Sequence, residues 1–81
     1  MTARLVLYSR GYCHLCEDME QALEPLGREL GFSLRVVDVD SDPALEDLHG
    51  ERVPVLVDGD GREICHYFLD ADALRARLAV K

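Results

Sequence analysis

No stretch of this 81-residue chain is apolar over the roughly 20 residues that a membrane-spanning helix needs. Basic residues are also scarce, because 9 lysines and arginines stand against 16 aspartates and glutamates and leave a net charge of −7. Such a surface repels nucleic acid backbones and anionic lipid headgroups, so we expect no nucleic acid and no membrane partner. The apolar run Leu5-Val6-Leu7 is too short for a secretory signal, and we therefore expect a cytoplasmic protein.

The chain has three cysteines, an odd number that cannot all pair within one molecule. A secreted scaffold held together by disulfides is therefore not expected. Cys13 and Cys16 form a Cys-x-x-Cys motif, which in a reducing compartment indicates either redox chemistry or half of a metal site. Because 48% of the residues are apolar and no linker, repeat or low-complexity stretch is present, we expect one folded domain over residues 1–81.

The first half of the chain changes its hydrophobic period twice. A short apolar run at residues 4–8 is typical of a strand that is covered on both faces. A helical stripe follows over residues 13–30, and we expect Pro25 and Gly27 to kink or weaken its second half. Residues 33–40 read as a second strand, so the three elements predict a βαβ unit with parallel strands.

The second half of the chain predicts two short helices around a hairpin. A helix should run from Pro43 to about Leu48. Strands at 53–57 and 62–68, joined by an Asp/Gly turn, predict an antiparallel hairpin, and Asp70 is the expected N-cap of the last helix. The expected fold class is α/β: a four-stranded mixed sheet, βαβ followed by α and ββα, with helices on both faces.

The two cysteines of the motif lie at the start of the first predicted helix. The free N–H groups and the dipole of a helix start stabilise a thiolate over a thiol, so Cys13 is the expected attacking group. Cys16 is one turn further and can attack a mixed disulfide formed at Cys13, which releases the reduced substrate. His14, if protonated, would favour the thiolate further, or it is a solvated residue without that effect.

A Cys-x-x-Cys motif in a βαβ unit, together with a Val-Pro that leads into a hairpin, resembles the glutaredoxins of the thioredoxin fold. The resemblance covers essentially all of the chain, and it extends to small bacterial glutaredoxin-like proteins with a segment of the type Tyr8-Ser9-Arg10-Gly11-Tyr12-Cys13-His14-Leu15-Cys16. It implies a monomeric thiol–disulfide oxidoreductase with Cys13 as nucleophile and Cys16 as resolving cysteine. Its implied substrates are protein disulfides or glutathione mixed disulfides, with no bound cofactor, and glutathione as co-substrate or an upstream reductase supplies the electrons.

The resemblance also implies a set of substrate-binding residues. Arg10 falls where glutaredoxins carry a basic residue that contacts a carboxylate of glutathione. The Val-Pro pair matches their Thr-Val-Pro, which would make Pro54 cis and let the Val53 backbone pair with a bound peptide or glutathione. The residues assigned in this way are Arg10, Tyr12, His14, Arg52, Val53 and Pro54.

The sequence departs from the glutaredoxin pattern at three places. His14 and Leu15 replace the usual proline and aromatic residue between the cysteines, and Arg52 replaces threonine. The Gly-Gly pair that helps to hold the γ-glutamyl end of glutathione is replaced by bulkier residues in the segment 67–70. From this sequence alone, Arg10 and Arg52 should meet around the cysteines and form a local positive patch that attracts an anionic partner.

Two alternatives to a redox enzyme remain at this stage. A metal site could combine the Cys-x-x-Cys pair with Cys65 and His66, but adjacent strand residues point to opposite faces and cannot easily reach one metal. A non-catalytic protein-binding module is the other alternative, although an exposed thiol pair has little packing value. We expect either Cys65 or His66 to face the covered side of the sheet, and His49 to be an exposed cation at a helix C-terminus.

Overall fold

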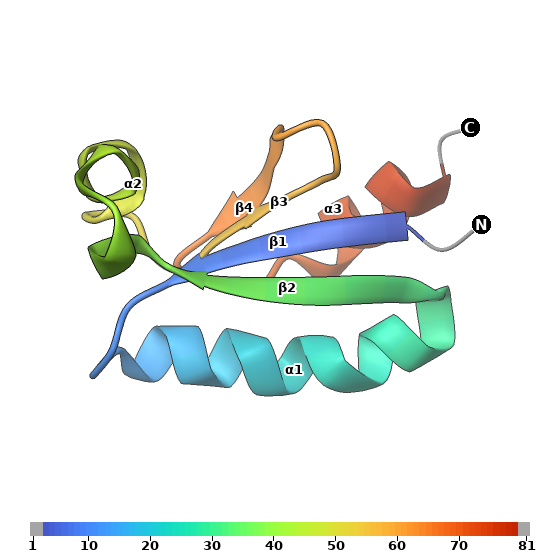
Figure 1. Cartoon of the computed structure of the whole chain (residues 1–81). Coiled ribbons are helices and arrows are strands. Elements are labelled where there is room, and N and C mark those ends of the chain that lie inside the picture. The colour runs from blue at the N-terminus through green and yellow to red at the C-terminus, as the bar shows by residue number, and fades with distance from the viewer. Residues whose placement is uncertain (1–2, 80–81) are drawn as a thin grey trace.

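The computed structural model describes residues 3–79, so the ends of the predicted domain, 1–2 and 80–81, lie outside the described residues. Helices and strands follow one another in the predicted order (Figure 1). They are β1 (Ala3–Ser9), α1 (His14–Leu30), β2 (Phe32–Asp38), the 3₁₀ turn η1 (Val39–Ser41), α2 (Pro43–His49), β3 (Val55–Val57), β4 (Glu63–His66) and α3 (Ala71–Ala79).

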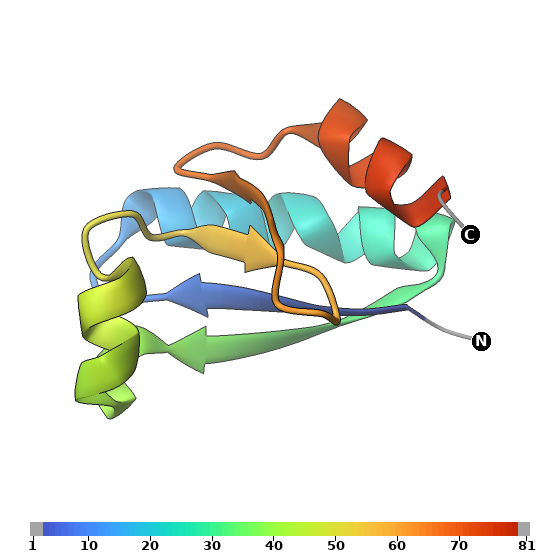
Figure 2. The ribbon, with the colours of Figure 1, turned by 90° about the horizontal axis from the view of Figure 1, so that it is seen from above.

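The strands form a mixed sheet in the order β2-β1-β3-β4 (Figure 2). β1 and β2 pair in parallel across the α1 crossover, with Ala3 opposite Phe32 and Ser9 opposite Asp38. β3 pairs antiparallel with both β1 and β4, as the predicted hairpin requires. The α/β fold class and the four-stranded mixed sheet are therefore confirmed.

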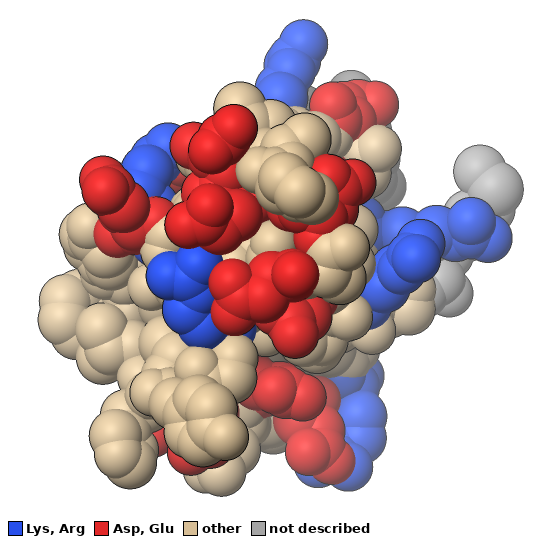
Figure 3. All heavy atoms as spheres, turned by 60° about the vertical axis from the view of Figure 1, so that its left-hand side comes forward, with Lys and Arg blue, Asp and Glu red and all other residues tan. Residues whose placement is uncertain are grey.

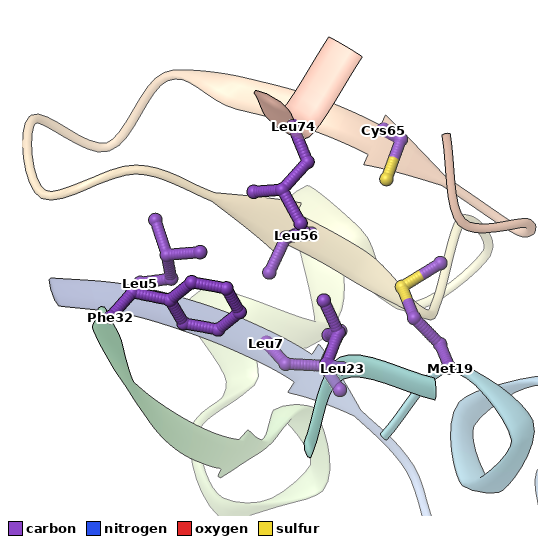
Figure 4. Close-up of a cluster of buried hydrophobic side chains, with 8 residues drawn as sticks. All are labelled: Leu5, Leu7, Met19, Leu23, Phe32, Leu56, Cys65 and Leu74. Carbon is purple, nitrogen blue, oxygen red and sulfur yellow. The ribbon is translucent and has the colours of Figure 1, made fainter. Parts of the chain in front are cut away.

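Helices lie on both faces of this sheet. α1 and α3 cover one face, where side chains from α1, α3 and all four strands form the main core (Figure 4). α2 lies toward the other face, at the end of the sheet where β1 and β2 finish (Figure 1). The buried members of the main core are Leu5, Leu7, Met19, Leu23, Phe32, Leu56, Cys65 and Leu74.

α1 is continuous over 17 residues with Pro25 inside it, so the two residues expected to kink or weaken its second half do not end the helix. Pro25 is exposed, so water can satisfy the carbonyl that loses its helical partner. Gly27 allows the helix to lie close to the sheet, since a Cβ there would be 3.2 Å from the carbonyl oxygen of Phe32. Gly31 ends the helix with φ 77°, a left-handed conformation that glycine adopts without strain.

Three of the strand bounds that differ from the predicted ones have a local structural cause. β2 ends at Asp38 rather than at residue 40, since the Asp38 carboxylate accepts the N–H of Asp40 at 2.9 Å and starts η1. β3 begins at Val55, after a cis peptide bond between Val53 and Pro54. β4 is shorter than predicted and ends before Tyr67, whose φ of 62° does not fit a strand. No helix within residues 3–79 is long and apolar enough to cross a membrane.

Candidate functional site

Cys13 and Cys16 lie at the N-terminus of α1 and are joined by a disulfide, with their Cα atoms 5.2 Å apart. Cys13 is the N-cap residue: its backbone is extended, and its Sγ accepts the N–H of Cys16 at 3.1 Å. Cys13 is partly exposed, whereas Cys16 is only 3% exposed. The sulfur that solvent reaches is therefore the one that the helix N-terminus supports.

A small hydrophobic cluster, called here the site cluster, holds this pair in place. Its buried members are Cys16, Val39 and Val53, and Tyr8, Cys13 and Leu45 pack against them. These six residues come from β1, the start of α1, η1, α2 and the loop before β3. The cluster thus brings the Cys-x-x-Cys motif against Val53, although the two are nearly forty residues apart in the sequence.

The loop before β3, residues 50–54, is fixed by Tyr67. The Tyr67 N–H donates to the carbonyl of Pro54 at 2.9 Å, and its hydroxyl donates to the carbonyl of Glu51 at 2.9 Å. Pro54 is fully buried, and its peptide bond with Val53 is cis, as the resemblance implies. Among the hydrogen bonds within residues 3–79, none uses the N–H or the carbonyl of Val53. That backbone edge therefore lies beside the disulfide with unused donor and acceptor groups.

Arg10 binds carboxylates and a carbonyl on the η1–α2 side. Its Nη2 lies 2.9 Å from Asp40 Oδ1 and 3.4 Å from Glu46 Oε1, and its Nη1 donates to the carbonyl of Gly50 at 3.3 Å. The hydrogen bond that the guanidinium donates to Asp40, with the negative charges of Asp40 and Glu46, raises the pKa of Arg10. Figure 3 turns the α2 end of the molecule toward the viewer and shows that acidic side chains gather on that face.

Arg52 is held in a second, separate network. Its guanidinium pairs with Glu63 and lies 3.3 Å from His66 Nδ1, and His66 Nδ1 is 2.8 Å from the other Glu63 oxygen. Burial acts to raise the pKa of Glu63, but the His66 hydrogen bond and the Arg52 charge outweigh it and lower that pKa. The predicted positive patch of Arg10 and Arg52 is therefore neutralised in the structure, because each arginine is bound to carboxylates of its own.

The remaining candidates differ in exposure. Tyr12, with φ 63°, is fully exposed immediately before Cys13, and His14 is exposed in the first turn of α1. His49 is less exposed than expected: its ring stacks on Tyr8 with centroids 4.3 Å apart, and its Nδ1 is buried with no hydrogen-bond partner among residues 3–79. Sequence reasoning missed both Tyr8 and Tyr67 as site residues, and no local motif signals either contact.

Cys65 and His66 point to opposite sides of β4, as predicted. Cys65 is 8% exposed in the main core, and burial raises the pKa of its thiol, while His66 is partly exposed and contacts Glu63. Within the described part of the chain, no three His, Cys, Asp or Glu side chains are placed to hold one metal ion. Cys65 therefore lies apart from the sulfur pair, as a small core side chain.

A four-stranded mixed sheet with three helices and a Cys-x-x-Cys at the start of α1 defines a small protein of the thioredoxin fold. The family model that matches the chain is the glutaredoxin-like domain (DUF836), over residues 4–79. The chain therefore belongs to this glutaredoxin-like family. The search of curated proteins gave no match.

Solved structures agree with this assignment. A solution structure of a protein from Nitrosomonas europaea is 41% identical, with a TM-score of 0.88 over 98% of this chain and 94% of that one. A crystal structure of a protein from X. campestris is 44% identical, with a TM-score of 0.70 over 95% and 97% of the two chains. The holo form of glutaredoxin C1 from Populus tremula × tremuloides is 26% identical, with a TM-score of 0.52 over 90% and 71%. The glutaredoxin-like domain and its cysteine pair indicate a role in thiol redox chemistry.

Proposed function

We propose that this chain is a thiol–disulfide oxidoreductase that acts as a monomer on protein disulfides or glutathione mixed disulfides. The observation that carries the proposal is the position of Cys13 as N-cap of α1, where its sulfur accepts the N–H of Cys16. The same donor would stabilise negative charge on that sulfur in the reduced protein.

In the proposed reaction, the reduced protein carries a Cys13 thiolate and a Cys16 thiol. The thiolate attacks one sulfur of the substrate disulfide, so that a Cys13–substrate disulfide forms and the other substrate sulfur leaves as a thiolate. Cys16 then loses its proton and attacks Cys13, which closes the Cys13–Cys16 disulfide and releases the second substrate thiol. Two electrons pass from the protein to the substrate, and glutathione or an upstream dithiol reductase returns them without a bound cofactor.

The backbone of Val53 supports binding of an extended segment beside this chemistry. Its unused N–H and carbonyl give the pair of hydrogen bonds by which an added strand is held, and Val53 itself packs against Cys16. A peptide bound there would place its own cysteine near Cys13. Tyr12 and His14, both exposed next to Cys13, are the proposed side-chain contacts of this segment.

The test is the equilibrium of the cysteine pair in a graded series of glutathione redox buffers, followed by alkylation and intact-mass measurement. We expect one two-electron transition, with Cys13 alkylated fastest in the reduced protein and the buried Cys65 slowest. The Cys16→Ser variant should accumulate a mixed disulfide at Cys13, because the resolving sulfur is missing. A pair that never closes, or purified protein with stoichiometric zinc on these sulfurs, would instead favour a metal or protein-binding module.

A further inference from the structure

The two arginines that the sequence suggested for substrate binding, Arg10 and Arg52, are already engaged by the protein itself. Arg10 has a carboxylate from η1, a carboxylate from α2 and a backbone carbonyl around one guanidinium. Arg52 is paired with Glu63 of β4. A substrate carboxylate that approaches either arginine must displace one of these groups, and it meets their negative charge as it does so.

Protein groups hold the Arg10 guanidinium from two sides. A substrate carboxylate would therefore displace the partners of Arg10 less easily than the partner of Arg52. Asp40 accepts from two of its nitrogens, Nε at 3.3 Å and Nη2 at 2.9 Å, a bidentate arrangement that fixes the plane of the guanidinium. The buried Gly50 packs beneath it, since a Cβ on this glycine would be 3.2 Å from Arg10 Nη2. The guanidinium therefore has a defined position that is turned toward the protein's own acids.

Exposed aromatic side chains lie instead next to Cys13 and next to the residue that fixes the loop 50–54. Tyr12, the residue before Cys13, is fully exposed, and Phe68 is 69% exposed. Phe68 directly follows Tyr67, which hydrogen-bonds to the carbonyl of Pro54, so it belongs to the same end of the domain. A polypeptide can use these side chains together with the Val53 backbone, whereas free glutathione brings carboxylates and has no aromatic side chain.

We propose that Asp40 and Glu46 determine specificity: by occupying Arg10 they turn the site away from glutathione disulfide and toward polypeptide disulfides without acidic residues beside the cysteine. This inference rests on the proposed function and names its substrate class. The electron transfer is the two-step exchange described above, with a peptide disulfide as the oxidant and the Cys13–Cys16 dithiol as the reductant. Arg10 becomes available to an anionic substrate only when its two carboxylates are neutralised.

The test measures single-turnover oxidation of the pre-reduced protein by two disulfides. One is glutathione disulfide, and the other is the disulfide dimer of the neutral peptide acetyl-Gly-Phe-Cys-Gly-amide. Each rate is divided by the rate at which dithiothreitol reduces the same disulfide, which removes their intrinsic difference in reactivity. We expect the corrected rate of the wild-type protein to be about tenfold higher with the peptide, the order of effect of one charge-assisted contact.

The Asp40→Asn/Glu46→Gln variant should shift the ratio of these two rates toward glutathione disulfide by about tenfold. Adding Arg10→Gln to that variant should cancel the shift, because the gain acts through the released guanidinium. The Glu24→Gln/Glu29→Gln variant is the matched control, since it makes the same change in net charge on a later part of α1. These acids pair with Arg28 and Arg75, and we expect the ratio to stay at the wild-type value.

The outcomes separate the inference from the proposed function. The specificity inference is overturned if the corrected rates of the wild-type protein with glutathione disulfide and with the peptide disulfide are equal. It is also overturned if the Asp40→Asn/Glu46→Gln variant leaves the ratio of these rates unchanged. A shift that persists with Arg10→Gln, or that the control variant reproduces, also overturns it, because net charge would then be the cause. If neither disulfide oxidises the protein faster than it oxidises Cys13→Ser, the oxidoreductase function itself fails.

Discussion

The main core and the site cluster each bury one cysteine, and they surround it differently. Cys65 sits among leucines at the edge strand β4, where burial raises the pKa of its thiol. Cys16 is buried as deeply in the site cluster, but its backbone N–H reaches Cys13 and its sulfur pairs with that residue. Burial alone therefore does not decide what a cysteine does; the neighbouring sulfur and the start of a helix separate the two cases.

The test with the largest expected effect removes one cysteine from each cluster. Cys13→Ser should reduce the rate of disulfide exchange by at least about 10³-fold, the order seen when a nucleophile is lost. Cys65→Ala should retain the wild-type rate while it lowers the free energy of unfolding, since a core atom is removed. Single-turnover oxidation of the reduced proteins, alongside urea unfolding, measures both effects. Loss of exchange in Cys65→Ala would show that the main core takes part in the chemistry.

A second test compares how much each cluster contributes to stability. Leu23→Ala removes a fully buried side chain of the main core and should lower the free energy of unfolding by about 2–5 kcal/mol. Val39→Ala, fully buried in the site cluster, should cost about 1–2 kcal/mol, because fewer methyl groups are lost. Urea unfolding curves, fitted with the same dependence of free energy on urea concentration, give both free energies of unfolding. An equal or larger cost at Val39 would mean that the site cluster, not the main core, holds the fold together.

The smallest expected effect is the pH dependence of the ion pair between Asp58 and Arg77. Burial acts to raise the pKa of Asp58, but hydrogen bonds from the Arg62 N–H, the Arg77 guanidinium and the Asp60 N–H lower it below its ordinary value of 3.8. A carboxylate with a lowered folded pKa stabilises the protein above the unfolded pKa, and this contribution is lost as the pH falls through the folded value.

Asp58→Asn should therefore lower the free energy of unfolding by about 1 kcal/mol at pH 6, and the difference from wild type should narrow toward pH 3. Urea midpoints measured from pH 3 to pH 7 follow this difference. Glu24→Gln, which alters an exposed pair on α1, serves as the reference and should show a smaller difference at every pH. A gap between Asp58→Asn and wild type that widens in acid would contradict the direction given for the Asp58 pKa.

The sequence predicts the elements and their order well, because hydrophobic period and turn residues are local signals. The parallel βαβ unit, the hairpin and the cap residue Asp70 all follow from such signals. Strand ends are less well predicted, since a single side chain such as Asp38 can start a turn within an otherwise strand-like run. The meeting of the cysteine pair with Val53 followed from the resemblance rather than from any local pattern.

The contacts of the arginines could not be predicted, because they join residues far apart in the chain. Arg10 is 30 positions from Asp40 and 36 from Glu46, and spacing along the sequence does not show which of several nearby acids a long side chain will bind. The stacking of His49 on Tyr8 depends in the same way on where α2 lies against the sheet. A motif can therefore show where charge gathers, while only the folded structure shows which charges are already paired.

One consequence follows from the position of the disulfide within a single turn of α1. Its two cysteines are only three positions apart, so the bond closes a very short loop. A cross-link restricts the unfolded chain less as the loop it closes becomes shorter, so opening this one releases comparatively little disorder. Opening this bond should therefore change the free energy of unfolding less than opening a disulfide that closes a long loop.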